Sequence, residues 1–172
     1  MLETGLVMDR QLAISSIIQH AESQHGDVEI VSRETHGPLF RYTYADCAKR
    51  TRRLANALRE LGVQPGERVA TIAWNNQRHL EVYYAVSGSG MVLHTCNPRL
   101  HPQQLIYIIN HAEDRVVMFD STFAPLIKAM AKHCPTVQHW ISFTDRAHMP
   151  AAEGMPALLC YEELLDAQSD QF

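Results

Sequence analysis

The sequence predicts an α/β protein with a mainly parallel central sheet flanked by helices. Helical and strand-like segments alternate four times between residues 43 and 143. The strand-like segments are short apolar runs, which are typical of strands buried on both faces. A helix separates each run from the next, and a strand, a crossover helix and a second strand imply parallel pairing.

Two elements precede this repeat. Residues 11–24 carry apolar side chains at helical spacing that stop at His25-Gly26-Asp27, so they predict a first helix. Residues 28–31 and 39–43 are strand-like runs joined by a polar segment containing His36-Gly37-Pro38. This arrangement predicts a hairpin at an edge.

The next helix has the clearest pattern in the chain. Thr43 followed by Asp46 has the form of a capping box, one face is apolar up to Leu61, and Gly62 marks the end. Four basic residues lie on its other faces: Lys49, Arg50, Arg52 and Arg53. They would fit nucleic acid or a solvated helix face, and the pattern favours the solvated face.

The remaining repeat follows in order. We expect strands at residues 67–73, 91–94, 115–120 and 136–143, and helices from Asn76 to the segment 87–90, from Pro102 to 112, and from Ser121 to Cys134. Residues 144–160 predict an irregular connection, and residues 161–165 predict a short helix. A short helix after a long loop would leave the last strand poorly covered, so we expect the natural chain to continue beyond Phe172.

Composition excludes several classes of protein. Hydrophobic residues make up 46% and charged residues 20% of the 172 residues, as in an ordinary soluble domain. A net charge of −4 with scattered basic residues argues against nucleic-acid binding. No apolar window is long enough for a membrane span and the first residues are acidic, so we predict a cytoplasmic protein. The four cysteines are widely spaced, which predicts no disulfide framework and a buried position for most of the thiols.

Sequence motifs for catalysis are missing. The ten histidines show no metal-ligand spacing, and no nucleophile elbow or phosphate-binding glycine loop occurs. Ser87-Gly88-Ser89-Gly90 ends a helix, so it predicts a helix cap. The carboxylate pairs Glu113/Asp114 and Glu162/Glu163 are adjacent in sequence and therefore face apart. We predict no catalytic residue and no metal site within this chain.

The loop of residues 95–99 is the exception. It follows the carboxyl end of a predicted parallel strand, where ligands bind in open α/β sheets, and Arg99 could donate hydrogen bonds to a phosphate. Equally, Asn97-Pro98 could be a structural turn and Arg99 a surface cation.

The stretch LGVQPGERVATIAWNNQRHLEVYYAVSGSGMVLHTCNPRL (61–100), with residues 101–120, resembles the amino-terminal part of AMP-forming acyl-CoA synthetases. It is most similar to the medium- and long-chain fatty-acid–CoA ligase branch. The segment 62–70 follows a pattern shared by the whole adenylate-forming superfamily, whereas Arg-His-Leu-Glu at 78–81 and residues 93–100 are closer to the fatty-acyl branch. The resemblance extends over residues 11–165.

This resemblance implies that residues 1–172 are the amino-terminal portion of the large N-terminal domain of an acyl-CoA synthetase. The complete enzyme would use ATP, Mg²⁺ and CoA to convert a fatty acid to an acyl-adenylate and then to a thioester, while its main catalytic groups would lie beyond Phe172. The chain alone would be inactive. The resemblance also implies that Arg99 lies near the CoA nucleotide phosphates, and that residues 1–10 are an arm exchanged between the subunits of a homodimer.

Two alternatives remain. The chain could be a stand-alone, non-catalytic α/β module for binding or dimerisation. It could also belong to a ligase for aromatic or short acids, since later residues would build most of the acyl pocket.

Overall fold

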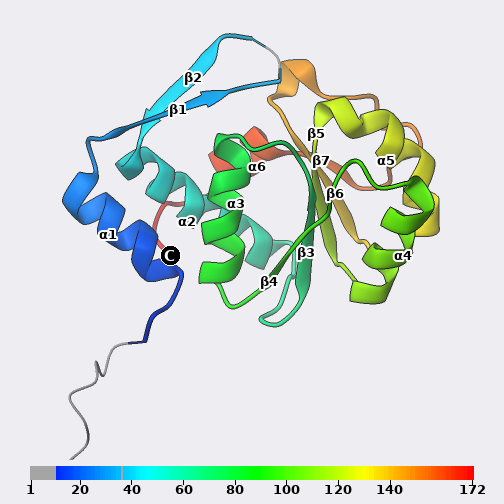
Figure 1. Ribbon diagram of the computed structural model, residues 1–172, viewed down its shortest axis with the longest axis horizontal. Coiled ribbons are helices and arrows are strands. Elements are labelled where there is room, and N and C mark those ends of the chain that lie inside the picture. Colours follow the sequence, from blue (N-terminus) through cyan, green and yellow to red (C-terminus); the bar gives the residue numbers. More distant parts are fainter. Residues whose placement is uncertain (1–10, 36) are drawn as a thin grey trace, which may run out of the picture.

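A five-stranded parallel sheet forms the centre of the protein (Figure 1). The computed structural model describes residues 11–35 and 37–172. The strands lie in the order β4-β3-β5-β6-β7 and all their pairings are parallel. Their bounds are β3 Arg68–Ile72, β4 Val92–Thr95, β5 Val116–Asp120, β6 His139–Phe143 and β7 Leu158–Cys160. The predicted α/β class with a mainly parallel sheet is confirmed.

Helices cover both faces of the sheet. One side holds α2 (Tyr44–Glu60), α3 (Gln77–Gly88) and α6 (Tyr161–Asp166), and the other holds α4 (Pro102–Ala112) and α5 (Ala124–Met130) (Figure 1). Strand β5 explains the layering because all its residues are buried and alternate between the two cores. Val116 and Met118 face the α2 side, whereas Val117 and Phe119 face the α4 side.

The N-terminal elements pack outside these layers. Helix α1 (Ser15–His25) lies against α2 and α3. Strands β1 (Glu29–Arg33) and β2 (Leu39–Thr43) form the predicted antiparallel hairpin, but as a sheet of their own that does not extend the parallel sheet. The cause is local packing, since Tyr42 of the hairpin is buried with Cys47 and Ala48 of α2.

Both ends of α2 match the sequence pattern. Thr43 accepts a hydrogen bond from the Asp46 N–H at 3.2 Å, and Asp46 accepts one from the Thr43 N–H at 3.1 Å. At the other end Gly62 has a φ of +86°, and the Val63 N–H donates to the Leu58 carbonyl at 3.1 Å. This left-handed glycine closes the helix in a Schellman motif.

Several boundaries differ from expectation. Strand β6 begins at His139, three residues later than expected. Helix α1 begins at Ser15, four residues later than predicted, and the segment 144–160 contains β7 as well as a 3₁₀ turn at Arg146–His148. Further 3₁₀ turns, Ser121–Phe123 and Ala131–His133, flank α5. Strand β7 has three residues and forms by pairing with β6, a contact that local spacing does not reveal. The proposed exchange arm, residues 1–10, lies outside the described residues.

Candidate functional site

The loop after β4 presents Arg99 at the carboxyl end of an edge strand. The side chain of Asn97 accepts a hydrogen bond from the Arg99 N–H at 3.0 Å, and the Leu100 N–H donates to the Asn97 carbonyl at 3.2 Å. These bonds fix a tight turn. His101 then caps α4 by accepting from the Gln103 N–H at 3.3 Å. The backbone around Arg99 is therefore held on both sides.

The side chain of Arg99 is free to meet a ligand. Arg99 is exposed, and among the residues that the structure describes its guanidinium has no hydrogen-bond or ion-pair partner. A guanidinium is permanently charged and offers donors in the planar arrangement that suits phosphate oxygens. A held turn therefore carries an exposed cation that can meet an anionic group.

The strand order places a second group of polar residues at the crevice between β3 and β5. The chain runs from β3 to β4 on one side and then to β5 on the other, and such a reversal is where open α/β sheets form ligand crevices. Asp120, at the end of β5, accepts hydrogen bonds there from the Trp74 N–H and from the Asn76 amide at 3.0 Å. The Thr35 hydroxyl also lies 3.5 Å from this carboxylate.

Asp120 anchors the segments that meet at this end of the sheet. Its side chain is buried, and that burial raises the pKa of Asp120 even though its hydrogen-bond donors lower it. Asn76 in turn caps α3 by accepting from the His79 N–H at 3.0 Å. One carboxylate therefore joins β5, the loop before α3 and the hairpin segment.

A buried network of charges joins α2, α3 and α6. The Arg50 guanidinium donates to Glu81 at 2.8 Å and to the two carboxylate oxygens of Glu162 at 2.9 and 3.1 Å. Arg78 bridges Glu162 at 2.6 Å and Glu34 at 2.9 Å. The network thereby links the hairpin to α6.

The two carboxylates on Arg50 have opposite pKa shifts. Burial raises the pKa of Glu81, which is fully enclosed, more than Arg50 and the Tyr161 hydroxyl lower it. Burial also acts to raise the pKa of Glu162, but hydrogen bonds and charge from Arg50 and Arg78 outweigh it and lower that pKa. Of the two carboxylates that Arg50 binds, Glu162 is thus the one that stays ionised more readily.

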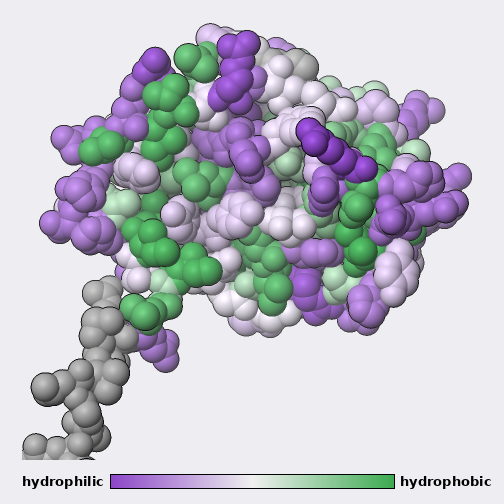
Figure 2. Space-filling view, in the orientation of Figure 1, coloured by the Kyte–Doolittle hydropathy of each residue, from purple (hydrophilic) through white to green (hydrophobic). Residues whose placement is uncertain are grey.

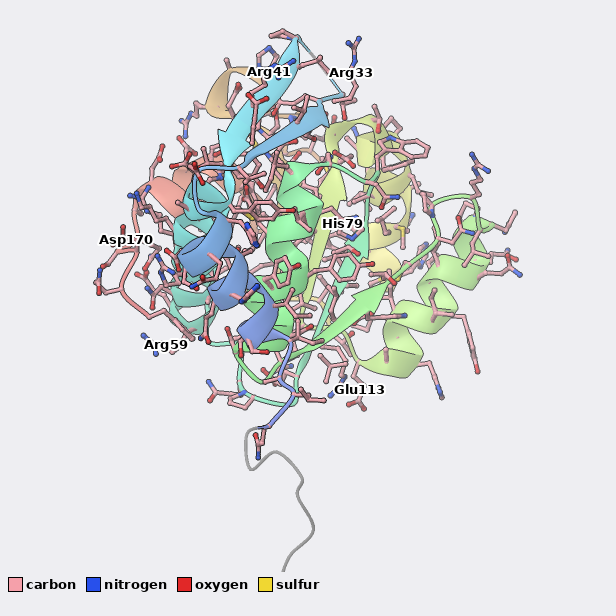
Figure 3. The ribbon with its side chains drawn as sticks, turned by 60° about the vertical axis from the view of Figure 1, so that its left-hand side comes forward. Arg33, Arg41, Arg59, His79, Glu113 and Asp170 are labelled. Carbon is pink, nitrogen blue, oxygen red and sulfur yellow. The ribbon has the colours of Figure 1, made fainter. Side chains whose placement is uncertain are left out.

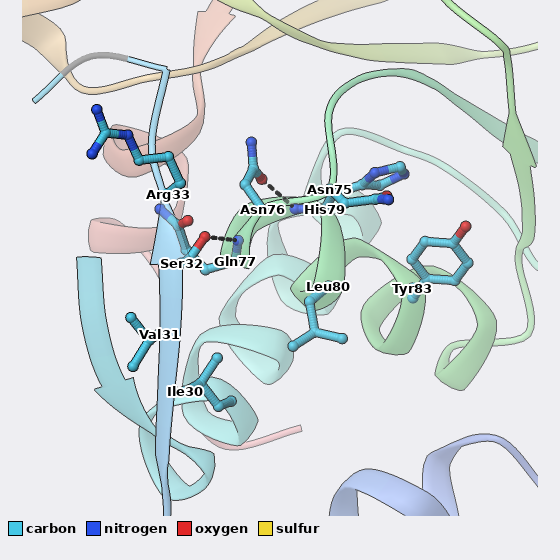
Figure 4. Close-up of a pocket in the computed structure, with 10 residues that line it drawn as sticks. All are labelled: Ile30, Val31, Ser32, Arg33, Asn75, Asn76, Gln77, His79, Leu80 and Tyr83. Atoms are coloured by element: carbon cyan, nitrogen blue, oxygen red, sulfur yellow. Dashed lines mark hydrogen bonds between the residues drawn. The ribbon is translucent and has the colours of Figure 1, made fainter. Parts of the chain in front are cut away.

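A groove of about 370 Å³ lies between β1 and the start of α3 (Figure 4). Figure 4 shows Leu80 and Tyr83 along the α3 wall, and the Gln77 N–H donates to the Ser32 hydroxyl at 3.0 Å across the groove. His79 forms part of this wall, and burial lowers the pKa of its imidazole. Its ring nitrogens lie 3.0 Å from the Thr71 hydroxyl and 3.2 Å from the Trp74 carbonyl, so both are occupied.

The exposed surface beside this groove is partly apolar. Figure 2 shows apolar side chains on the α1 and hairpin side of the visible face, interspersed with polar ones. Exposed apolar residues here include Ile17 on α1, Val28 just before β1 and Val31 on β1.

A family model described as AMP-binding enzyme matches residues 18–161. The chain belongs to this family. The 3-methylmercaptopropionyl-CoA ligase of Ruegeria lacuscaerulensis is 48% identical over 168 residues, which cover 98% of this chain and 31% of that protein. The medium-chain-fatty-acid–CoA ligase of Ectopseudomonas oleovorans is 46% identical with the same coverage. The chain therefore spans about a third of the length of these curated relatives.

The fold agrees with this family. A crystal structure of a putative long-chain-fatty-acid CoA ligase from Rhodopseudomonas palustris superposes with a TM-score of 0.74, at 19% identity, over 94% of this chain and 37% of that one. The resemblance to acyl-CoA synthetases is confirmed.

The outcome for individual residues is mixed. Arg99 lies in a tight turn and is exposed, so its role in binding CoA stays a prediction. The solvated-face interpretation of α2 is wrong for Arg50, which is mostly enclosed, and Arg52 pairs with Glu22 at 2.8 Å. Glu162 and Glu163 do face apart, since Glu163 pairs with Arg146 at the surface.

Sequence reasoning missed Asp120 and Glu81. An acidic residue ending a fully apolar strand run was the available signal for Asp120, whereas Glu81 gave no signal because its partners are 31 and 80 residues away.

All four cysteines are free and buried, as predicted. Within residues 11–35 and 37–172 no group of three or more His, Cys, Asp or Glu side chains has an arrangement that could hold a metal ion. No helix among these residues combines the length and apolar content that a membrane crossing needs.

Proposed function

We propose that the complete protein is an ATP-dependent, AMP-forming ligase that joins a medium- or long-chain fatty acid to CoA. The acid's carboxylate would attack the α-phosphate of ATP to give an acyl-adenylate and pyrophosphate, and the CoA thiol would then displace AMP. Membership of the AMP-binding family and 46% identity to a medium-chain-fatty-acid–CoA ligase support this proposal.

This chain would contribute scaffold and one wall of the CoA entrance. The observation that carries this role is the exposed Arg99 side chain, which has no partner among the described residues and stands on a turn fixed by Asn97. Its guanidinium would contact the nucleotide phosphates of CoA by charge-assisted hydrogen bonds.

Groups for ATP and Mg²⁺ would come from elsewhere in the protein. The described residues gather no cluster that suits a divalent cation. The 172-residue chain alone, mixed with ATP, Mg²⁺, CoA and a fatty acid, should accordingly form no thioester. Thioester formation by the chain alone would refute this part of the proposal.

Arg99→Ala in the complete protein tests the CoA contact. A charge-assisted hydrogen bond contributes about 1.5–3 kcal/mol, and because each 1.4 kcal/mol is tenfold, KM for CoA should rise by about tenfold or more. KM for ATP and for the acid should not change. Arg41→Ala, which removes a cation from the hairpin (Figure 3), is the control and should leave all three constants unchanged. An unchanged KM for CoA in the Arg99 variant would refute the contact.

A short acid is the second candidate substrate. It is favoured by the 48% identity to a 3-methylmercaptopropionyl-CoA ligase. Assaying the complete protein with ATP, CoA and straight-chain acids of increasing length, together with 3-methylmercaptopropionate and benzoate, separates the candidates. Highest kcat/KM for acids of medium or greater length supports the first proposal, and a preference for the short sulfur-containing acid supports the second.

We also propose a cytoplasmic homodimer paired through the N-terminal region, with residues 1–10 exchanged between subunits. Sedimentation of the complete protein with and without these residues tests the arm. Loss of the dimer on deletion is expected, and an intact dimer would refute the exchange.

A further inference from the structure

A cysteine, a histidine and a carboxylate lie together beneath α4, apart from the Arg99 side chain and the buried charge network. The Cys96 sulfur is 3.7 Å from Nε2 and 3.9 Å from Nδ1 of His94, and His94 Nδ1 is 2.8 Å from Oδ2 of Asp114. Cys96 and His94 are two residues apart on and just after β4, so both side chains point to the same face of the sheet. Asp114 reaches them from the loop after α4.

Asp114 orients His94 and keeps it protonated. The Asp114 side chain is fully buried, and burial raises the pKa of this carboxyl. The hydrogen bond to Asp114, with a further contribution from Cys96, raises the pKa of His94 to about 10. The pair therefore holds its proton on the imidazole at neutral pH, and a positive charge lies beside the Cys96 sulfur.

Titratable groups near this cluster come from β3, from the residue that precedes Asp114 and from the segment before β6. Arg68 of β3 acts on Asp114 and pairs with Glu113 at 3.0 Å, and Figure 3 labels Glu113, which directly precedes Asp114. The thiol of Cys134, before β6, is also influenced by the Asp114 charge. None of these groups lies between His94 and the Cys96 sulfur as a hydrogen-bond partner in the described part of the chain.

The other three cysteines have different surroundings. Burial raises the pKa of Cys47 and of Cys134 to about 11, and it raises the pKa of Cys160 as well. The Cys160 thiol donates to the Thr144 carbonyl at 3.2 Å. Among the described residues, Cys96 alone has an imidazole within reach of its sulfur.

We propose that Cys96 is a redox modification site that reacts with hydrogen peroxide, with His94 beside it as proton donor. The Cys96 sulfur attacks one peroxide oxygen, so that an S–O bond forms, the O–O bond breaks and the proton of the thiol is released to solvent. The leaving hydroxide takes the proton of the His94 imidazolium and departs as water. Sulfur is oxidised by two electrons to the sulfenic acid and peroxide is reduced, which leaves neutral His94 bonded to Asp114.

Access to the sulfur limits the reagent to a small one. Cys96 is 5% exposed, whereas 26% of the His94 side chain is exposed on the outermost strand of the sheet. Hydrogen peroxide is little larger than water, so it can reach a sulfur that lies directly beside an accessible ring. This site does not depend on the proposed ligase activity, and it can be tested without any substrate.

The test is a comparison of the four thiols within one molecule. The protein is exposed to hydrogen peroxide for increasing times, treated with catalase, then denatured in N-ethylmaleimide so that each remaining thiol is labelled and counted by peptide mass spectrometry. Cys96 should lose its free thiol about tenfold faster than Cys47, Cys134 and Cys160. Equal rates for all four would overturn the proposal.

Two variants test whether the oxidation rate of Cys96 depends on the His94 imidazole or only on solvent access to the sulfur. His94→Gln keeps an amide able to donate to Asp114 but removes the cation, and it should slow Cys96 oxidation by about tenfold while the other thiols stay protected. His111→Gln, on α4, is the matched control and should leave the rate unchanged. An unchanged Cys96 rate in His94→Gln would overturn the role of His94. Should that variant unfold, all four thiols would oxidise alike, and the ranking in the unsubstituted protein then decides.

Discussion

Replacing Arg50 with Met tests how the buried charges of α2, α3 and α6 are held. Glu162 would keep Arg78 as a partner at 2.6 Å, but Glu81 would keep, among the described residues, only the Tyr161 hydroxyl at 2.7 Å. The Glu81 side chain is fully enclosed, so its charge would be left without compensation. Removing one partner of a buried ion pair costs about 3–5 kcal/mol, and we expect the free energy of unfolding to fall by that amount at neutral pH.

The loss of unfolding free energy in Arg50→Met should depend on pH, because Glu81 titrates. Burial raises the pKa of Glu81 in the folded state above that in the unfolded chain, so the folded state binds this proton more readily. Its contribution to stability is therefore greatest at low pH and is lost as pH rises from the unfolded pKa, about 4.3, through the raised folded pKa. Without Arg50 the folded pKa rises further, so the deficit of Arg50→Met should shrink as the pH is lowered.

Urea denaturation followed by circular dichroism, at about pH 5 and about pH 7.5, measures both effects. Arg50→Met combined with Glu81→Gln should recover most of the stability, because Gln is neutral and can still accept from Tyr161. Arg41→Met is the control, since Arg41 and Glu29 are each about half exposed and their pair contributes less than about 1 kcal/mol. A loss below about 1 kcal/mol for Arg50→Met, or a loss that neither pH nor Glu81→Gln relieves, would refute the reasoning.

Two further substitutions test the helix cap and the core by the same denaturation measurement. Thr43→Ala removes the acceptor for the Asp46 N–H and should lower the free energy of unfolding by about 1 kcal/mol; no loss would mean that the capping box does not stabilise α2. Leu58→Ala, at a fully buried position between α2 and the sheet, should cost about 2–5 kcal/mol. The partly buried Leu164, changed to Ala, should cost less, and equal losses would contradict the burial argument.

The elements that the sequence predicted well are those whose signals are local. The cap at Thr43, the stop at Gly62 and the proline that opens α4 each act within one turn of helix, so spacing was enough to find them. The apolar run of β5 was equally clear because both faces of this strand are buried. Periodicity and capping residues therefore determined the order of helices and strands.

The features that the sequence did not predict depend on contacts between residues that are far apart in the chain. Strand β7 exists through its pairing with β6, and a run of three residues carries too little periodicity to be recognised. Arg50 looked like a solvent-facing cation because its partners Glu81 and Glu162 lie 31 and 112 residues away. The candidate site shows the same division, since the Arg99 turn could be predicted from Asn97-Pro98, whereas the crevice around Asp120 depends on the strand order.

The distance along the chain between Arg50 and Glu162 also bears on the order of folding. The charge network cannot close until α6 has docked, which brings residues 112 positions apart into contact and carries a high loop-closure entropy. We therefore expect α2, β3 and α3 to associate first and the Glu162 contacts to form after the folding barrier. Weakening those contacts should then mainly accelerate unfolding and leave the refolding rate nearly unchanged.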